Sequence, residues 1–407
     1  NKIERGGSEI GRYANRAIKE SDADIVIMLC DDDALFPNYL NNLNRFYNYN
    51  PKIYYAYCKL KYYDPTIVNY TVKDYSGENQ NWKIDQSFED YIYIGNNNGL
   101  LEYNGADWKI YPSSNNSIIR SVKVINEKIF TGCYMDFGYW IKDNYGNLAY
   151  TSLVHKLPKA LLNDESFWNI VQFEDYVLFQ SLKRIYIYNS SDESFKILEA
   201  PSKRAVLFKV GNAIYFQKSD KGIFKIENGE GLLVSDEKEV KDQEIVGAFL
   251  IDKKTMFLTE KGEFYFYENG SLSQWNISSN QTLSSENFYS SSILSDGSFI
   301  LGTISNGIYH INPKGDLIQH INKENGLLNN TVLCVFEDKD KNIWVAHFHG
   351  ACVSVFSNKA KLIHKISLPA KNITNCAFGG QNNSEVFITT ATKGMNNAEL
   401  QKFRYSG

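Results

Sequence analysis

Three consecutive carboxylates, Asp31, Asp32 and Asp33, directly follow the apolar run Ile25–Cys30. The run has the length and composition of a buried strand, and Pro37 can open the helix that follows it. The strand end therefore presents several acidic side chains together, and carboxylate oxygens are the ligands that Mg²⁺ and Mn²⁺ prefer. Asp31 and Asp33 are the candidate metal ligands of the chain, and a solvated strand end is the alternative.

A second candidate for metal binding is the pair His347 and His349, separated by one residue on a predicted strand. Alternation along a strand would place both imidazoles on one face, where they could hold a metal together. No third ligand lies nearby in the sequence, so exposed or hydrogen-bonded histidines are the alternative. No catalytic residue is predicted.

An internal repeat indicates which secondary-structure elements would position a functional site. A short apolar strand motif recurs from residue 90 onward, with a spacing of about 42 residues. Its copies are Ile92–Gly95, Ile129–Gly132, Val177–Gln180, Ile214–Gln217, Met256–Thr259, Phe299–Gly302, Ile343–Ala346 and Val386–Thr389. Each copy follows a polar turn and precedes another turn and further strands, which is the order of an antiparallel meander.

A repeat of this length is typical of β-propeller blades, because blades packed radially bury each other's faces. We therefore predict a mainly β fold, a seven- or eight-bladed β-propeller with a short N-terminal α/β appendage. The repeated strand is predicted to be the innermost strand and fully buried. If the last unit only completes the first, seven blades result, and a closing strand is expected from Ile67–Lys73. An open solenoid or several small sandwiches are the alternatives.

Composition limits the partners of the chain. The net charge is −4, so there is no basic excess and no nucleic-acid partner is expected. No apolar run reaches the roughly 18 residues of a membrane span, and the N-terminal residues have no signal-peptide core. We expect buried thiols rather than disulfides or a zinc site, because no two cysteines form a Cys-x-x-Cys pair. The cysteines are Cys30, Cys58, Cys133, Cys334, Cys352 and Cys376.

The stretch from about Ile67 to Phe336 resembles the two-component-regulator propeller family. The resemblance is carried by NQNWKIDQ, IGNNNGLLEYNGADWKIYP, DFGYW and VLFQS. It implies a sensor propeller, periplasmic or extracellular, that takes part in signal transduction by reading carbohydrates or other nutrients. The β-sandwich, membrane helix and output domain through which such proteins signal are not recognised in this sequence.

Residues 337–407 have a different character. The words NIWVA, ISLPAKNITNCAFGG and VFITTA resemble the C-terminal part of the gluconolactonase and senescence-marker-protein (regucalcin-like) family. That resemblance implies a propeller that opens sugar lactones with a divalent metal held by Glu, Asn and Asp. It places the Asp eleven residues before Trp344, at Leu333, which cannot ligate a metal. The lactonase site is therefore expected to be absent.

Residues 1–64 resemble an internal fragment of a family 2 glycosyltransferase. The resemblance rests on ANRAI, on the strand Ile25–Cys30 with the aspartates that follow it, and on Pro37–Leu40. It implies that Asp31 and Asp33 hold a Mn²⁺ or Mg²⁺ ion that neutralises a nucleotide-sugar diphosphate. The nucleotide-base and acceptor halves of such an enzyme are not recognised, because propeller sequence begins after Asp64.

We thus predict three regions: a truncated glycosyltransferase-like fragment (1–64), regulator-type blades (65–336) and lactonase-like final blades (337–407). Such a composite is natural, assembled or designed. The function expected is non-enzymatic recognition of a carbohydrate or other polar small molecule, without a cofactor. Loops at the ends of the ring would form the site, with exposed Tyr and Trp stacking on sugar faces. A metal-dependent glycosyltransferase is the first alternative, and a sugar lactonase is the second.

Overall fold

The computed structural model describes residues 68, 70–268, 270–358, 361–379, 385–403 and 406. The chain divides into two compact units, Asn1–Val68 and Asn69–Gly407. The predicted α/β segment 1–64 lies outside the described residues, and with it Asp31 and Asp33 as well as Cys30 and Cys58. The second unit is described below.

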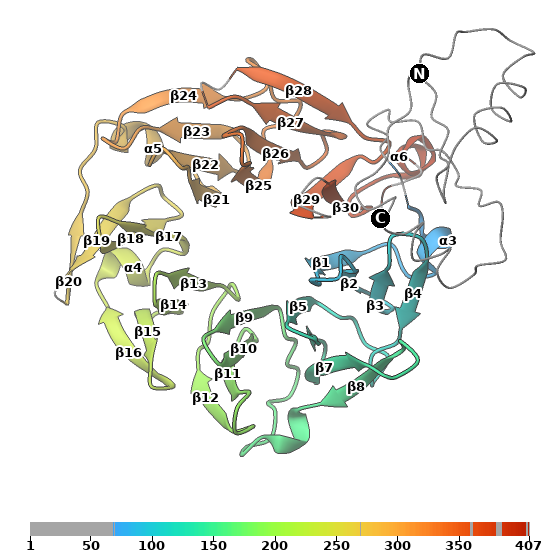
Figure 1. The fold of residues 1–407 in the computed structure, drawn as a ribbon. Coiled ribbons are helices and arrows are strands. Elements are labelled where there is room, and N and C mark those ends of the chain that lie inside the picture. Colours follow the sequence, from blue (N-terminus) through green and yellow to red (C-terminus); the bar gives the residue numbers. More distant parts are fainter. Residues whose placement is uncertain are drawn as a thin grey trace, which may run out of the picture. The chain divides into compact units, whose positions relative to one another are not determined.

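The second unit is a ring of antiparallel sheets around a central channel (Figure 1). Within the described residues, seven sheets have four strands each and one further sheet has two. We number the four-stranded sheets as blades 1 to 7 in chain order and call the two-stranded one the eighth sheet. The mainly β fold and the propeller prediction are thus confirmed, with seven complete blades.

The strands of the first four blades follow one another along the chain. Blade 1 contains β1 (Asn81–Gln86), β2 (Ile92–Asn96), β3 (Gly99–Tyr103) and β4 (Trp108–Tyr111), and blade 2 contains β5 (Ser121–Ile125), β6 (Lys128–Gly132), β7 (Phe137–Lys142) and β8 (Leu148–Ser152). Blade 3 contains β9 (Asn169–Phe173), β10 (Tyr176–Gln180), β11 (Arg184–Asn189) and β12 (Phe195–Glu199), and blade 4 contains β13 (Leu207–Val210), β14 (Ala213–Lys218), β15 (Gly222–Glu227) and β16 (Glu230–Ser235).

The remaining blades repeat the same order. Blade 5 contains β17 (Ile245–Ile251), β18 (Lys254–Thr259), β19 (Phe264–Glu268) and β20 (Ser271–Gln274), and blade 6 contains β21 (Phe288–Ile293), β22 (Phe299–Thr303), β23 (Ile308–Ile311) and β24 (Leu317–Ile321). Blade 7 contains β25 (Val332–Glu337), β26 (Ile343–His347), β27 (Cys352–Phe356) and β28 (Leu362–Ser367), and the eighth sheet contains β29 (Asn372–Gly379) and β30 (Glu385–Ala391). The short helices are α3 (Val72–Tyr75), the 3₁₀ helix η2 (Val154–Lys156), α4 (Lys238–Lys241), α5 (Asn280–Leu283) and α6 (Asn397–Lys402).

The repeated apolar motif forms the second strand of each unit, so its predicted place as the innermost strand is wrong. First strands contact each other around the channel, as β1 does with β5 and β5 with β9. The motif strands are nevertheless buried, and every residue of β2 and β22 is buried. A second strand is covered by strands on both edges and by blades on both faces, whereas a first strand has one edge at the channel.

The eighth sheet closes the ring between blade 7 and blade 1. Cys376 of β29 shares a buried cluster with Val353 of blade 7. On the other side β30 contacts β1, and Phe387 packs against the buried Ile92 of blade 1. Each sheet therefore buries its apolar faces against its neighbours, as the repeat requires.

The end of the predicted closing strand Ile67–Lys73 is helical instead, because Val72 and Lys73 belong to helix α3, whereas residues 67 and 69 lie outside the described chain. The carboxylate of Asp74 accepts hydrogen bonds from the backbone N–H and the hydroxyl of Thr71, at 2.5 and 2.7 Å. This local side-chain capping fixes a helical turn where the apolar alternation favoured a strand.

Glycines allow the third and fourth strands of several blades to approach closely. Gly307 directly precedes β23, the third strand of blade 6, and has a φ of +80°. A Cβ at this position would lie 2.1 Å from the carbonyl oxygen of Ile321. A Cβ added at Gly138 of blade 2 would likewise lie 2.1 Å from the carbonyl oxygen of Thr151. The words that begin with glycine in the repeat, such as GIYHIN, thus mark a recurring backbone contact.

Candidate functional site at the channel mouth

Each blade repeats the same meander, so all first strands run in the same direction along the channel. Their starts therefore lie at one end of the ring, together with the turns that join second and third strands. We call this end the channel mouth, and its principal residues are Trp82, Arg120, Trp168, Arg204 and Tyr289. The turns between first and second strands lie at the opposite end.

A β-bulge marks the start of several first strands. Trp82 is the extra, unpaired residue of β1, and Tyr289 is its counterpart in β21. The same position is occupied by Leu333 in blade 7 and by Thr374 in the eighth sheet. A bulge releases a side chain from the ladder and re-aims it, so this position is suited to present side chains at the mouth.

Arg120 and Trp168 occupy the matching positions of blades 2 and 3. Each lies one residue before its first strand. The backbone N–H of Arg120 donates to the carbonyl of Gly132, and that of Trp168 donates to Gln180, both at 2.9 Å. Gly132 and Gln180 each end a copy of the repeated motif, so the two residues are in register with each other.

Three of these side chains form one cluster that spans blades 1 to 3. The guanidinium carbon of Arg120 lies 4.6 Å from the ring centre of Trp82 and 4.3 Å from that of Trp168. The two indole rings contact edge to face, with centres 5.8 Å apart. The indole N–H of Trp82 donates to Asn97 Oδ1 at 2.8 Å, which fixes the ring. A contact between blades 1 and 3 passes over blade 2, so the cluster narrows the mouth.

The Arg120 side chain has no acidic partner among the described residues. Its Nε is buried and has no hydrogen-bond acceptor within them. Burial is the cause that lowers the pKa of Arg120, and no carboxylate offsets it. The guanidinium remains charged, because its ordinary pKa lies far above neutrality. Within the described residues, this cation contacts two aromatic rings, and its Nε donor has no acceptor.

A second arginine crosses the mouth from blade 4 to blade 6. The guanidinium of Arg204 lies 4.5 Å from the ring centre of Tyr289 and donates to the backbone carbonyl of that residue at 3.4 Å. Blade 5 stands between the two blades that carry them. Of the three arginines in the described residues, only Arg184 is paired with a carboxylate, that of Glu199 at 2.7 Å.

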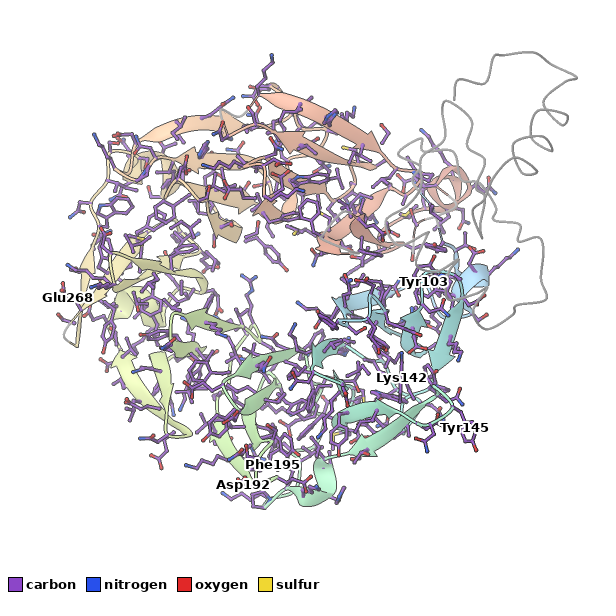
Figure 2. All side chains as sticks on the ribbon, viewed as in Figure 1. Tyr103, Lys142, Tyr145, Asp192, Phe195 and Glu268 are labelled. Atoms are coloured by element: carbon purple, nitrogen blue, oxygen red, sulfur yellow. The ribbon has the colours of Figure 1, made fainter. Side chains whose placement is uncertain are left out.

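Several apolar side chains at the mouth face solvent. Trp168 is 37% exposed, Tyr289 39% and Tyr134 42%. Leu182 and Ile304, in turns between second and third strands, are exposed at the same end. Side chains also project into the central opening in Figure 2, whereas Tyr145, Asp192 and Glu268 lie at the outer rim. Trp168, Tyr134 and Tyr289 are thus exposed aromatic residues at this end, and their stacking on sugar faces stays a prediction.

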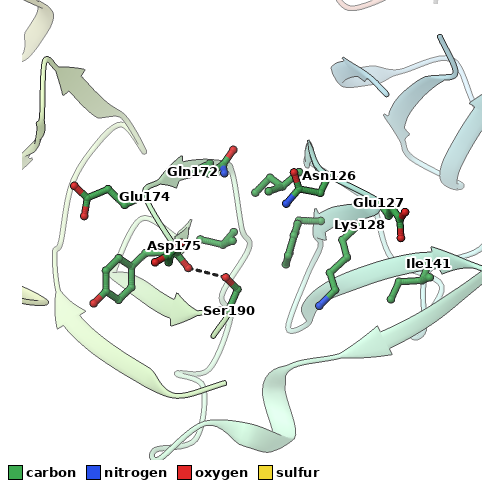
Figure 3. Close-up of a pocket in the computed structure, with 12 residues that line it drawn as sticks. Asn126, Glu127, Lys128, Ile141, Gln172, Glu174, Asp175 and Ser190 are labelled. Atoms are coloured by element: carbon green, nitrogen blue, oxygen red, sulfur yellow. Dashed lines mark hydrogen bonds between the residues drawn. The ribbon is translucent and has the colours of Figure 1, made fainter. Parts of the chain in front are cut away.

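A groove of about 440 Å³ lies at the opposite end, between blades 2 and 3 (Figure 3). Hairpin turns line it with Glu127, Lys128, Glu174 and Asp175. The Lys128 ammonium lies 4.4 Å from the ring centre of Tyr139, so this cation is already engaged. No buried side-chain atom without a partner belongs to its lining residues within the described chain. We therefore favour the mouth.

The predicted pairing of His347 and His349 on one strand face is wrong. β26 ends at His347, and His349 lies in the following turn with a φ of +62°. His347 is fully buried, and burial lowers its pKa to about 4 although the Asn329 backbone acts in the opposite direction. Glycine at position 350 allows this turn, because a Cβ there would lie 2.4 Å from the His347 Cβ.

The described residues do not fit a lactonase metal centre. Leu333, where the resemblance places an aspartate, is the bulged residue of β25 at the mouth and offers no oxygen ligand. The equivalent residues include Tyr289 and Thr374, and no group of three or more His, Cys, Asp or Glu in the described chain could hold a metal. The donor set at this position therefore differs from the Glu, Asn and Asp that the resemblance implies.

Ser298, His310 and Asp296 have the residue types of a hydrolytic triad but the wrong arrangement. The Ser298 hydroxyl donates to Asp296 at 2.6 Å, and His310 Nε2 lies 3.0 Å from the same hydroxyl. The imidazole must then donate to the serine, so it cannot act as its base. Ser298 and His310 are also buried, which excludes a substrate.

The four cysteines in the described residues are free thiols. Cys133, Cys352 and Cys376 are buried and Cys334 is half-buried, as expected for all but the last. In the part of the chain that the structure describes, no helix is both long and apolar enough to cross a membrane.

Comparison with known proteins supports part of the predicted resemblance. The SMP-30/gluconolactonase/LRE-like region matches residues 333–392, which comprise blade 7 and the eighth sheet. The putative sugar lactone lactonase YvrE of Bacillus subtilis (strain 168) is 39% identical over 71 residues, 17% of this chain and 24% of the relative. Regucalcin of Danio rerio is 37% identical over 71 residues, 17% of this chain and 23% of the relative. The chain thus matches about a quarter of these relatives, and the predicted resemblance of its C-terminal region is confirmed.

Two solved structures are among those similar to this chain. The computationally designed Ika8 protein has a TM-score of 0.55 and 10% identity, covering 77% of this chain and 98% of that chain. This likeness concerns the fold alone. The extracellular domain of the putative one component system BT4673 from B. thetaiotaomicron has a TM-score of 0.44 and 18% identity, covering 76% of this chain and 50% of that chain.

Proposed function

We propose that the propeller is a non-enzymatic recognition module that binds a carbohydrate or another polar small molecule at the channel mouth. The observation that carries the proposal is the cluster of Trp82, Arg120 and Trp168, drawn from three consecutive blades. No catalytic arrangement accompanies the cluster in the described residues, and this favours binding over chemistry.

The residue types at the mouth suit a sugar. Indole and phenol rings pack against the apolar C–H faces of a pyranose, and their polar atoms bond its hydroxyls. Trp168 and Tyr289 are each more than a third exposed, so their rings are accessible. Trp82 is fixed by Asn97, which reduces the loss of side-chain entropy on binding.

The resemblance of about Ile67–Phe336 to regulator propellers supports a sensor role, in the periplasm or outside the cell. The lactonase alternative is favoured by the family match over 333–392 and opposed by Leu333. The glycosyltransferase alternative, and with it a Mn²⁺ or Mg²⁺ ion at Asp31 and Asp33, rests on residues outside the described structure and stays a prediction.

A glycan array with the wild-type chain, Trp168→Ala and Tyr145→Ala tests the proposal. Tyr145 is 90% exposed in the turn between β7 and β8, at the end opposite the mouth, so it is a matched aromatic control. We expect the wild type and Tyr145→Ala to bind the same glycans and Trp168→Ala to lose about tenfold or more in affinity. Equal binding by all three chains would contradict a site at the mouth.

A further inference from the structure

We propose that the mouth recognises an acidic saccharide, with the Arg120 guanidinium binding a carboxylate or sulfate group of the ligand. This inference rests on the proposed function and adds a chemical class to it. It follows from the state of Arg120, which is a preorganised cation without a counter-ion among the described residues.

A guanidinium has five N–H donors in a planar fork that matches a carboxylate or sulfate. The Trp82 and Trp168 rings are tilted by 80° to each other, so the guanidinium can stack face-on against only one of them and keeps in-plane donors for a ligand. Arg184 shows the usual solution in this protein, since its Nε donates to Glu199 at 2.7 Å. Arg120 has the same chemistry without such a partner, and an anionic ligand would supply one.

Two acidic groups at the same end of blades 2 and 3 are already engaged. Asp136, in the turn after β6, accepts from the hydroxyl of Ser152 at 2.7 Å. Glu165, in the segment before β9, accepts from the hydroxyls of Ser181 and Tyr186 at 2.7 and 2.6 Å. Both carboxylates are buried, so neither turns toward Arg120 without breaking these bonds.

Arg204 adds a second cation that contacts an aromatic ring, although it also donates to a backbone carbonyl. It lies over the ring of Tyr289 and has no carboxylate partner among the described residues. A second positive group at this end would add to the attraction of Arg120 for an anion.

Calorimetric titration with matched neutral and acidic probes tests the inference. Digalacturonate and its dimethyl ester differ in carboxylate charge, and cellobiose 6-sulfate and cellobiose differ in sulfate. We expect the wild type to bind one acidic probe at least about tenfold more tightly than its neutral counterpart. Arg120→Gln should remove that preference, so that the acidic probe and its neutral counterpart bind this variant with equal affinity. The pair that shows the preference identifies the anion.

Two further variants keep the test decisive. Lys203→Gln removes a positive charge beside Arg204 without touching an aromatic ring, and it should retain the preference. Arg120→Lys keeps the charge but loses the planar fork, so it should weaken acidic binding several-fold even if Arg120→Gln does not fold. Equal binding of acidic and neutral probes, or a preference that survives both Arg120 variants, overturns the inference. If neutral glycans still bind through Trp168, the proposed function stands without it.

Discussion

His347 is an imidazole that the fold keeps neutral. Burial lowers its pKa from 6.5 to about 4, so the unfolded chain takes up this proton first as the pH falls. Its contribution to stability is therefore complete above pH 6.5 and is lost as the pH falls through 6.5 towards 4.

Replacing His347 should flatten the acid side of the stability profile. As the pH is lowered from 6.5 to 4, the free energy of unfolding of the wild type should fall by about 3 kcal/mol more than that of His347→Phe. Urea titrations across that range measure it. His364→Gln, at an exposed position of β28, should follow the wild-type profile. Identical slopes for His347→Phe and the wild type would contradict a buried neutral His347.

The residues at the mouth were not predicted individually, although the sequence carries a signal for them. Trp82 lies 13 residues before the end of its motif copy, Arg120 and Trp168 lie 12 before theirs, and Tyr289 lies 13 before its own. An alignment of the repeat units on the last residue of each motif copy would have placed these four residues at nearly the same position. What the sequence could not give is the contact between blades 1 and 3, because it depends on how the ring curves.

At the scale of the strands, periodicity found the second strands and misplaced them in the blade. A run that is apolar at every residue indicates a strand covered on both faces, and this holds for β2 and β22. The distance of a strand from the channel, in contrast, leaves no comparable pattern in the sequence. First strands such as β1 alternate weakly, because one edge faces the channel.

The close strand approach at Gly307 is testable against a glycine of similar backbone angle. Gly270 has a φ of +84° with no atom within 4 Å of an added Cβ, whereas Gly307 at +80° would place its Cβ 2.1 Å from the Ile321 carbonyl oxygen. Gly270→Ala should cost about 1 kcal/mol of unfolding free energy for its φ alone. Gly307→Ala should cost about 2 kcal/mol more, by urea denaturation. Equal costs would mean that the third strand shifts freely.

At the scale of the ring, the predicted boundary at 336/337 falls within β25, and the family match begins at residue 333, near the start of the same strand. Blades contact mainly their neighbours, so one end of a propeller can resemble another family while the ring stays closed. The predicted propeller followed from this repetition. The two-stranded form of the eighth sheet could not be predicted in this way, because the eighth motif copy at Val386–Thr389 has the same pattern as the copies in the four-stranded blades.

Hydroxyl-radical footprinting, with and without a glycan taken from the array, tests most directly whether the ligand binds at the mouth, across blades 1 to 6. We predict protection of Trp82, Trp168 and Tyr289 on binding, with Tyr145 oxidised at an unchanged rate. Protection of Tyr176 in the groove between blades 2 and 3, with Trp168 and Tyr289 unaffected, would place the site at the other end of the ring and contradict binding at the mouth.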